Sequence, residues 1–501
     1  MEWTREQRYQ PYKGEHDPNM IALKQQVDAC PWRQLFHIQP ITGLLNDPNG
    51  FSYYNGEYHL FYQWFPQGPV HGLKHWYHTV SKDLVHWENK GLALTPDRYY
   101  DSHGAFSGSA IEHDGKLLLM YTGNTRDAQW IRKPYQAVAS MDEQGTVTKS
   151  AHAVIEGTPE GYTDHYRDPK VWKDDKTGRY FAIIGAQRTD ETGCVVLYSS
   201  PDMQEWSFAG EIKTKLPSFG FMWECPDYVE WDGKGLLLFS PQGIEPEGHQ
   251  YRNIYQSGYL LGEKLDLESL NFEHGSFQEL DRGFDFYAPQ SMLTPDGRRV
   301  MVGWMGLPEV ECPSDAHGWA HCLTLPRVLT VSGDKLIQQP VEELKSLRLA
   351  GHEVTATLTD EKRGFEHFRG VHAELDVEFH NQDAKQFGVE LRTGEAERTI
   401  ISYDAATCEL TLDRTQSGVS CAEAYGTTRT CVLNASQDQP LKLHIFMDTS
   451  SIEVFVNDGE EVFTSRIFPR LDSDGITFFA SGGKLKLNAS IWQLSSMQNE
   501  A

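Results

Sequence analysis

Short apolar runs that each follow a glycine-containing turn dominate the chain between residues 37 and 340. Five turns of this kind precede an apolar run: Gly56 before 58–62, Gly115 before 117–121, Gly178 before 180–184, Gly233 before 236–239 and Gly297 before 300–304. Asn-Gly or Asp-Gly forms four of these turns, and both central residues of a type I′ hairpin turn require positive φ. The pattern predicts five β-hairpins and no long helix in this region.

The turn glycines recur at intervals of 59, 63, 55 and 64 residues. A second motif, Ser-x-Asp-apolar-x-x-Trp, occurs at 81–87 and again at 200–206. A regular period of this length in a strand-rich region is typical of propeller blades. We therefore predict an all-β fold with a five-bladed β-propeller. The alternative is a large β-sandwich whose hairpins are spaced regularly by chance.

The repeat of turn glycines and apolar runs is confined to residues 37–340, and the segments before and after it have other patterns. Residues 1–36 are polar and contain one short helical pattern at 19–30, which predicts an N-terminal arm. Residues 341–350 contain a short helical connector. Residues 351–501 end in alternating strands around Asn457-Asp-Gly459, which predicts a C-terminal β-sandwich domain. This last domain contains no cluster of acids, bases or metal ligands.

Charge and cysteine content narrow the classes of function. The chain has 71 acidic and 45 basic residues, a net charge of −26, which disfavours nucleic-acid binding. The charged start predicts no signal peptide, and no apolar run approaches the ~20 residues of a membrane helix. Eight scattered cysteines are then expected to be reduced thiols in the cytoplasm. The oligomeric state does not follow from the sequence.

Five polar residues occupy one position in the repeat, eight to ten residues before the turn glycine. They are Asp47, Ser107, Asp168, Glu224 and Tyr287. Equivalent positions of propeller blades face the same central axis, so these five side chains are expected to converge on one funnel. A purely structural repeat would instead keep the same residue in each copy. Asp47 lies in Asn46-Asp47-Pro48-Asn49-Gly50, which we interpret as a stiff turn that aims its carboxylate.

Three carboxylic acids in one cavity repel one another, so at least one should retain a proton at neutral pH. Two carboxyl groups that flank a glycosidic bond can hydrolyse it, one as acid and the other as nucleophile or base. Glu224 has the longer reach and suits the acid, whereas Asp47 suits the nucleophile. Arg167 beside Asp168 is expected to keep that carboxylate ionised. A separation of ~5–5.5 Å between the carboxyls of Asp47 and Glu224 is predicted for a retaining mechanism.

Other functions fit the residues less well. Each acid alone is more commonly a strand-end cap or a surface charge, and only their shared register favours a site. Three acids can bind a divalent metal, but no His-rich spacing or phosphate-binding glycine loop accompanies them, so neither metal nor cofactor is expected. There is no G-x-S-x-G motif for acyl transfer. Aromatic residues near the motifs, including Trp64, Phe106 and Trp304, suit the apolar faces of sugar rings or simple core packing.

The motifs resemble those of the invertase and fructanase family of glycoside hydrolases, family 32. The resemblance is carried by five ordered motifs: 44–50, 106–109, Arg167-Asp-Pro169, Glu224-Cys-Pro226 and 285–288. It extends to 452–456 and 465–469 near the C-terminus and implies a propeller followed by a β-sandwich. It also implies retaining hydrolysis of β-fructofuranosides, with Asp47 as nucleophile, Glu224 as acid/base and Asp168 as stabiliser of the transition state.

The resemblance further implies a substrate-binding set. These residues are Leu44, Leu45, Asn46, Gln63, Phe106, Ser107, Arg167, Tyr287 and Trp304. Leu44-Leu45 stands where many members of the family have Trp-Met. The segments 63–76 and 31–37 are similar to the bacterial sucrose-6-phosphate hydrolases within the family, which implies sucrose 6-phosphate, and also sucrose, as substrate. His71, Lys74 and His75 are candidate phosphate partners, although a solvated loop is the commoner role for such residues.

Two other functions stay open. The first is an invertase or exo-fructanase that acts inside the cell on unphosphorylated fructosides. The second is a non-catalytic propeller that only binds sugar, which would not need a protonated glutamic acid beside a nucleophilic aspartate.

Overall fold

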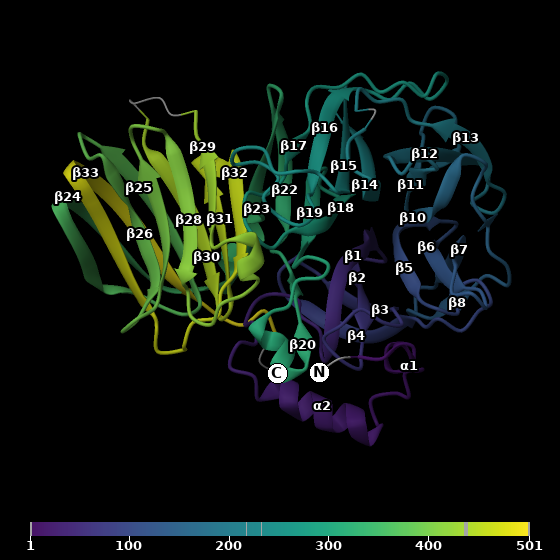
Figure 1. Ribbon diagram of the computed structural model, residues 1–501, viewed down its shortest axis with the longest axis horizontal. Helices are drawn as coiled ribbons and strands as arrows, with labels where there is room; N and C mark the ends of the chain where they lie inside the picture. Colours follow the sequence, from purple (N-terminus) through teal and green to yellow (C-terminus); the bar gives the residue numbers. More distant parts are fainter. Residues whose placement is uncertain (1–2, 217, 232, 435–438, 499–501) are drawn as a thin grey trace.

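The computed structural model describes residues 3–216, 218–231, 233–434 and 439–498. Two β-rich units lie side by side, the propeller on the right and the sandwich on the left of Figure 1. The predicted five-bladed propeller followed by a β-sandwich is confirmed. Turn residue Asp232 lies outside the described residues. Within the described ranges, no helix is long and apolar enough to cross a membrane.

Each blade is an antiparallel sheet whose first strand is innermost. Blade 1 contains β1 (Gly43–Tyr54), β2 (Glu57–Phe65), β3 (His75–Ser81) and β4 (Trp87–Leu94). Blade 2 contains β5 (Ala105–His113), β6 (Lys116–Arg126), β7 (Arg132–Met141), β8 (Val147–Lys149) and β9 (Ile155–Glu156). Blade 3 contains β10 (Tyr162–Lys173), β11 (Tyr180–Arg188), β12 (Gly193–Ser200) and β13 (Ser207–Glu211).

The last two blades follow the same plan. Blade 4 contains β14 (Met222–Trp231), β15 (Lys234–Gln242), β16 (Gly258–Glu263) and β17 (Gln278–Glu279). Blade 5 contains β18 (Tyr287–Leu293), β19 (Arg299–Met305), β21 (Cys322–Leu323), β22 (Arg327–Ser332) and β23 (Lys335–Pro340). A late strand, β20 (Trp319–Ala320), pairs in parallel with β1 and so joins the end of the propeller to blade 1.

The continuous apolar runs are explained by burial of both faces of each blade. In β15, Leu237 packs between blades 3 and 4, whereas Leu236 and Leu238 pack between blades 4 and 5. Successive side chains of a strand point to opposite faces, so a strand covered on both sides needs apolar residues at every position. This packing holds neighbouring blades face to face.

The Ser-x-Asp motif forms the turn between the third and fourth strands of two blades. In blade 1 the carboxylate of Asp83 accepts from the backbone N–H groups of Val85 and His86. Asp202 makes the equivalent contacts in blade 3. In each copy the Trp indole N–H donates to a backbone carbonyl three residues earlier, so the motif is structural.

Hydrogen bonds between the five inner strands close the ring. The pairs, in order around the axis, are Gly108 N–H to Asn49, Val171 N–H to Ser109, Lys170 to Asp227, Ser291 N–H to Asp227, and Phe51 N–H to Gln290. Each pair joins one blade to the next. The inner strands are therefore held in fixed register around the axis, which is a rigid frame for a site.

The N-terminal arm contains α1 (Arg5–Arg8) and α2 (Pro18–Asp28). Thr4 and Gln7 form a capping box at α1, and Asp17 caps α2. The sequence pattern predicts the second helix but not the first. Figure 1 places both helices at the foot of the propeller, close to β20 and blade 1.

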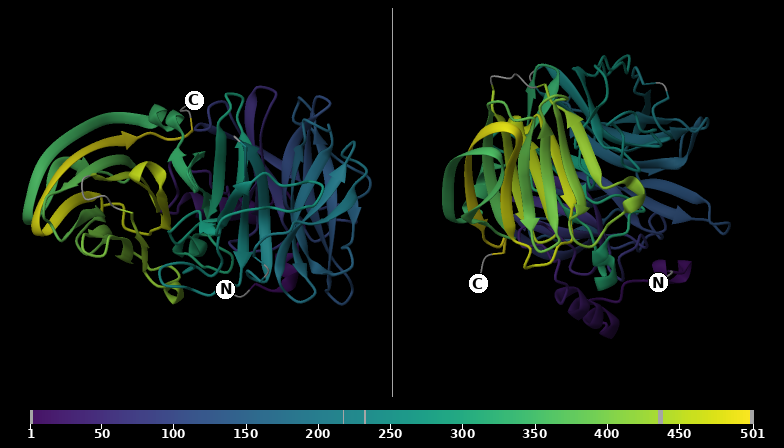
Figure 2. Two further views of the ribbon diagram at one scale, coloured as in Figure 1. Left: turned by 90° about the horizontal axis from the view of Figure 1, so that it is seen from above. Right: turned by 60° about the vertical axis from the view of Figure 1, so that its left-hand side comes forward.

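The C-terminal sandwich is built around two long curved strands, β24 (Arg348–Arg369) and β33 (Gly475–Leu494), which pair along most of their length. Figure 2 shows both strands bending around the outside of the domain. The first half of β33 pairs with β26 and the second half with β25, so one strand serves both layers. A short helical turn (Glu342–Leu347) connects the domain to the propeller.

The other sandwich strands continue these two layers. They are β25 (Ala373–Asn381), β26 (Gln386–Thr393), β27 (Arg398–Asp404), β28 (Glu409–Gln416), β29 (Thr428–Val432), β30 (Leu441–Asp448), β31 (Ser451–Val456) and β32 (Glu461–Arg466).

A buried ionic network joins the two domains. The His37 ring lies 2.7 Å from Asp448 and 3.0 Å from Glu453, and the Arg327 guanidinium lies 2.7 Å from Glu453. Burial alone would lower the pKa of His37, but the hydrogen bonds and charges of both carboxylates raise it to about 9. His37 is therefore protonated at neutral pH and holds the start of the propeller against the sandwich.

Candidate active site

The five residues predicted to converge all lie on inner strands. Asp47 is on β1, Ser107 on β5, Asp168 on β10, Glu224 on β14 and Tyr287 on β18. In each strand the pairing with the second strand of the blade shifts at this position. Each blade thus has a register shift beside its candidate site residue, and β1 and β10 each have a second shift.

These irregularities correct the interpretation of Asn46–Gly50 as a stiff turn. The segment lies inside β1, with register shifts on both of its sides. Turn-forming residues serve here as a bulge, which bends a strand and re-aims a side chain. Asp168 has φ of 69° at its bulge, and its N–H donates to Thr122 at 2.9 Å, which helps to hold this conformation.

Asp47 is 9% exposed and is enclosed by side chains that donate to it. The Ser107 hydroxyl donates to Oδ2 at 2.5 Å, Asn46 donates to Oδ1 at 3.1 Å, and Gln63 donates to Oδ2 at 3.3 Å. Burial raises the pKa of Asp47, and the charge of Glu224 adds to this, whereas Ser107, Asn46 and Lys74 oppose it. The hydrogen bonds fix the orientation of the carboxylate.

Asp168 lies beside the same centre. Its Oδ2 accepts from the backbone N–H of Cys225 at 2.9 Å. The Cys225 thiol lies 3.5 Å from Oδ2 of Asp168 and 3.5 Å from Oδ2 of Asp47, so one sulfur bridges the two carboxylates. Burial, together with the charges of Glu224 and Asp47, raises the pKa of Asp168 to about 7 even though Arg167 opposes the shift.

Glu224 is held by donors on both oxygens. Arg167 donates to Oε1 from Nε at 3.0 Å and from Nη2 at 2.7 Å. Gln242 donates to Oε2 at 2.8 Å and the Tyr287 hydroxyl donates to Oε2 at 2.6 Å. The expectation that Arg167 keeps Asp168 ionised is wrong, because its ion pair is with Glu224 and the pKa of Asp168 is raised.

The predicted substrate-binding residues separate into two groups. Asn46, Gln63, Ser107, Arg167 and Tyr287 contact the acids directly. Trp304 is buried and packs against Tyr287 at a ring distance of 6.0 Å, and the half-buried Phe106 precedes Ser107.

Leu44 and Leu45 belong to neither group. Leu44 packs with Phe65 and Ala320, and Leu45 lies within the apolar cluster between blades 1 and 5. Their side chains therefore form core rather than the wall of the acid cluster.

The three candidate phosphate partners of the segment 71–75 are not in a solvated loop. Lys74 and His75 are 3% and 1% exposed. Lys74 donates to Asn46 at 2.6 Å, and burial lowers its pKa to about 7. His75 faces the backbone of Leu73, and His71 packs beside Trp304. Lys74 therefore belongs to the Asp47 side of the site.

Two contacts were missed from the sequence, Gln242 on Glu224 and Thr122 on Asp168. A positional signal exists for such residues in the second strand of each blade. Gln63, Thr122 and Ser240 each lie seven residues after a turn glycine, and each contacts an inner-strand residue of the ring. The second strands of three blades therefore have a polar residue at the same position in the repeat, as the first strands do.

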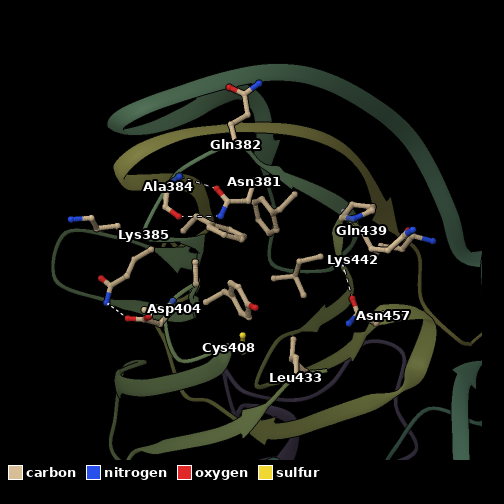
Figure 3. Close-up of a pocket in the computed structure, with 18 of the residues that line it drawn as sticks. Asn381, Gln382, Ala384, Lys385, Asp404, Cys408, Leu433, Gln439, Lys442 and Asn457 are labelled. Carbon is tan, nitrogen blue, oxygen red and sulfur yellow. Dashed lines mark hydrogen bonds between the residues drawn. The ribbon is translucent and has the colours of Figure 1, made fainter. Parts of the chain in front are cut away.

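A separate cavity of about 1240 Å³ lies in the sandwich, between Asn381, Lys385, Asp404 and Cys408 (Figure 3). Three of its four acids have partners: Asp404 accepts from Gln386 and from turn backbone, Asp383 accepts from the N–H of Lys484, and Asp458 pairs with Lys442. Its acids are exposed or half-buried, so the cavity lacks the cluster of buried carboxyls that the propeller presents. Among the described residues no group of His, Cys, Asp and Glu has a metal-binding arrangement.

Sequence comparison identifies the family. The N-terminal domain of glycosyl hydrolases family 32 matches residues 37–340, and the C-terminal domain of the same family matches residues 343–493. The chain belongs to family 32. This glycoside hydrolase is 46% identical to a sucrose-6-phosphate hydrolase of Staphylococcus xylosus, over 98% of this chain and 99% of that protein.

Solved structures of the family have the same fold. A sucrose-6-phosphate hydrolase of Lactobacillus gasseri is 39% identical, with a TM-score of 0.92 over 99% of this chain and 100% of that chain. A Bombyx mori GH32 β-fructofuranosidase mutant in complex with sucrose is 32% identical, with a TM-score of 0.81 over 96% and 99% of the two chains. The family 32 chain therefore matches both relatives over both domains.

Proposed function

We propose that this family 32 enzyme is a retaining β-fructofuranosidase that hydrolyses sucrose 6-phosphate, and also sucrose, to fructose and glucose 6-phosphate or glucose. The observation that carries the proposal is the convergence of Asp47, Asp168 and Glu224 from three blades around Cys225 and Arg167. The relatives named sucrose-6-phosphate hydrolase, which match this chain over nearly its whole length, support the substrate.

In the proposed mechanism Asp47 attacks the anomeric carbon of the fructosyl unit. Its two oxygens are already oriented by Ser107, Asn46 and Gln63, so little reorganisation is needed at attack. The bond to the glycosidic oxygen breaks as the bond to Asp47 forms. The product of this step is a fructosyl ester on the enzyme.

Glu224 provides the proton that the departing glucosyl oxygen needs. Burial and the mutual repulsion of the carboxyls keep a proton within the group near neutral pH, as the raised pKa values of Asp47 and Asp168 indicate. Glu224 then acts as base and removes a proton from the water that hydrolyses the ester. Arg167, Gln242 and Tyr287 keep its carboxyl in place through both steps.

Asp168 is proposed to bind fructosyl hydroxyls and to stabilise the positive charge that develops on the ring in the transition state. Asn46, Gln63, Phe106, Ser107 and Trp304 are proposed to line the fructose subsite. No step in this mechanism needs a metal or a cofactor. Phosphorylated sucrose arises where import is coupled to phosphotransfer, so we propose that the enzyme acts in the cytoplasm.

The experiment compares kcat/KM for sucrose 6-phosphate, sucrose and a short inulin. We expect the largest value for sucrose 6-phosphate. Equal kcat/KM values for the two sucrose substrates would contradict the proposal and indicate an invertase. A higher kcat/KM for inulin would indicate an exo-fructanase. A protein that binds these sugars but releases no hexose would be a non-catalytic propeller. Asp47→Ala controls for contaminating activity, since it should bind sugar without turnover.

A further inference from the structure

A cluster of cationic side chains lies beside Glu224 and is not used by the mechanism. Arg126 ends β6 and Arg132 begins β7, and the two are directly opposite each other in the hairpin. Like charges that face each other across two strands destabilise a sheet, so this pair has a cost in the free protein. In a chain with a net charge of −26, two adjacent arginines at this place require an explanation.

Within the described part of the chain, neither Arg126 nor Arg132 forms an ion pair with a carboxylate. No carboxylate lies within 4.0 Å of either guanidinium among the residues that the structure describes. Their Nε atoms are buried and have no hydrogen-bond partner in the same set of residues. Asp127, the acid nearest in sequence, accepts from the backbone of Gln129 and Ile131 in its own loop. The electrostatic contribution of Asp164 to Arg132 does not compensate for burial, which lowers the pKa of Arg132 to about 10.

The cluster is connected to the acid through one histidine. Nδ1 of His165 lies 3.4 Å from Nη1 of Arg132 and 3.1 Å from Nη1 of Arg167. A ring nitrogen that accepts from two guanidinium groups must be unprotonated, and burial with both positive charges lowers the pKa of His165 to about 4. Arg167 in turn binds Glu224. Arg132 thus lies on the side of the site where the leaving group departs, since the acid contacts the leaving oxygen.

The loop that carries the pair is held in place by the N-terminal arm. Arg126 donates to the backbone carbonyl of Trp130 at 3.3 Å. The Arg5 guanidinium lies 4.2 Å from the centre of the Trp130 ring, and Tyr9 packs edge-on against the same ring at 5.2 Å. The arm therefore adds a third cation to the rim and restrains the hairpin, which is how a preorganised anion site is built.

We propose that Arg126 and Arg132 form a subsite for the phosphate group on the leaving sugar, with His165 positioning Arg132. This inference rests on the proposed function and names the residues that select the phosphorylated substrate. A phosphate monoester carries nearly two negative charges at pH 7 and presents three acceptor oxygens, which suit the planar donor groups of arginine. Lys74 is excluded from this role because it is buried against Asn46 on the nucleophile's side.

The experiment measures kcat/KM for sucrose 6-phosphate and for sucrose in Arg126→Gln, Arg132→Gln and the double variant. We expect the ratio of the two values to fall about 10- to 150-fold in each single variant, because a hydrogen bond to a charged group contributes about 1.5–3 kcal/mol and each ~1.4 kcal/mol is a factor of about ten. Lys133→Gln is the matched control. It removes the same charge from the next residue of β7, whose side chain is 58% exposed and faces Asp127. Its ratio should stay within twofold of the wild type.

Product inhibition gives a second measurement that does not depend on turnover of the phosphorylated substrate. Glucose 6-phosphate should inhibit sucrose hydrolysis by the wild type far better than glucose or inorganic phosphate, and Arg132→Gln should remove this advantage. Inhibition by inorganic phosphate that equals that of glucose 6-phosphate would mean a general anion site and would overturn the assignment to the sugar phosphate.

The outcomes separate the two proposals. If the wild type has equal kcat/KM for sucrose 6-phosphate and sucrose, both the proposed phosphate preference and this inference are wrong. A wild type that prefers sucrose 6-phosphate while both arginine variants keep its ratio overturns the inference alone. Equal loss on both substrates in both variants also overturns it, since the arginines would then act through Arg167 and Glu224.

Discussion

The raised pKa of Asp168 predicts that Asp168→Asn stabilises the protein while it abolishes hydrolysis. The carboxyl is 5% exposed, and its pKa is about 7 instead of the ordinary 3.8. This difference of ~3 units corresponds to about 4 kcal/mol at ~1.4 kcal/mol per unit. It is the free energy by which the ionised carboxylate destabilises the folded state at pH 8. Asparagine removes the charge and can still accept from Cys225 N–H.

The sign of the pH dependence follows from linkage. The native state binds the Asp168 proton more tightly than the unfolded chain, so this contribution to stability is full below pH ~4. It is lost as the pH rises through about 7. Relative to wild type, Asp168→Asn should therefore gain about 2–4 kcal/mol at pH 8 and almost nothing at pH 4.

The assay is thermal unfolding followed by fluorescence at pH 4, 6 and 8, together with kcat/KM for the preferred fructoside. Asp227→Asn is the matched control, because Asp227 is also buried but has an ion pair with Lys170 at 3.2 Å. That variant should lower the melting temperature at pH 8. If Asp168→Asn also melts below wild type at pH 8, the attraction of Arg167 outweighs burial and repulsion, and the account of the carboxyl cluster is wrong.

Two further predictions concern Asp47 and the domain contact. Ser107→Ala removes the hydrogen bond that lowers the pKa of Asp47, so the acidic limb of the kcat/KM–pH profile should move to higher pH. The maximum of the profile should fall about tenfold. An acidic limb that does not move would show that Ser107 does not act on Asp47. His37→Gln removes the cation that lies between Asp448 and Glu453 and leaves Glu453 with Arg327 as its remaining charge partner, which should cost about 3–5 kcal/mol at pH 6.5 in urea unfolding. Because the pKa of His37 is about 9, this loss should shrink as the pH rises through 9, and a pH-independent loss would contradict the assignment of a protonated imidazole.

The fold could be predicted because its signals are local. Each turn glycine and the apolar run after it report one hairpin, and five hairpins at a regular period fix the number of blades. The convergence of Asp47, Asp168 and Glu224 follows from their shared place in that period. The sequence alone therefore carried the architecture and the centre of the candidate site.

Contacts that depend on the irregular backbone could not be predicted in this way. Adjacency in sequence suggested that Arg167 pairs with Asp168, but neighbouring strand residues point to opposite sides, and a bulge re-aims one of them. Arg167 consequently reaches Glu224 on the next blade. Residues 46–50 resemble a turn because bulges and turns use the same residue types. Lys74 resembles a loop residue, yet its ammonium group is buried against Asn46.

The central claim is that Asp47 forms a covalent bond to the fructosyl unit and that Glu224 acts as acid and base. Glu224→Gln should slow hydrolysis of the intermediate, while a fructosyl donor with a good leaving group still reacts with Asp47. Mass spectrometry of the denatured protein should then show one added fructosyl unit on the peptide that contains residues 46–50. An unmodified Asp47 peptide under these conditions, together with release of fructose in the inverted anomeric form by the wild type, would contradict the account.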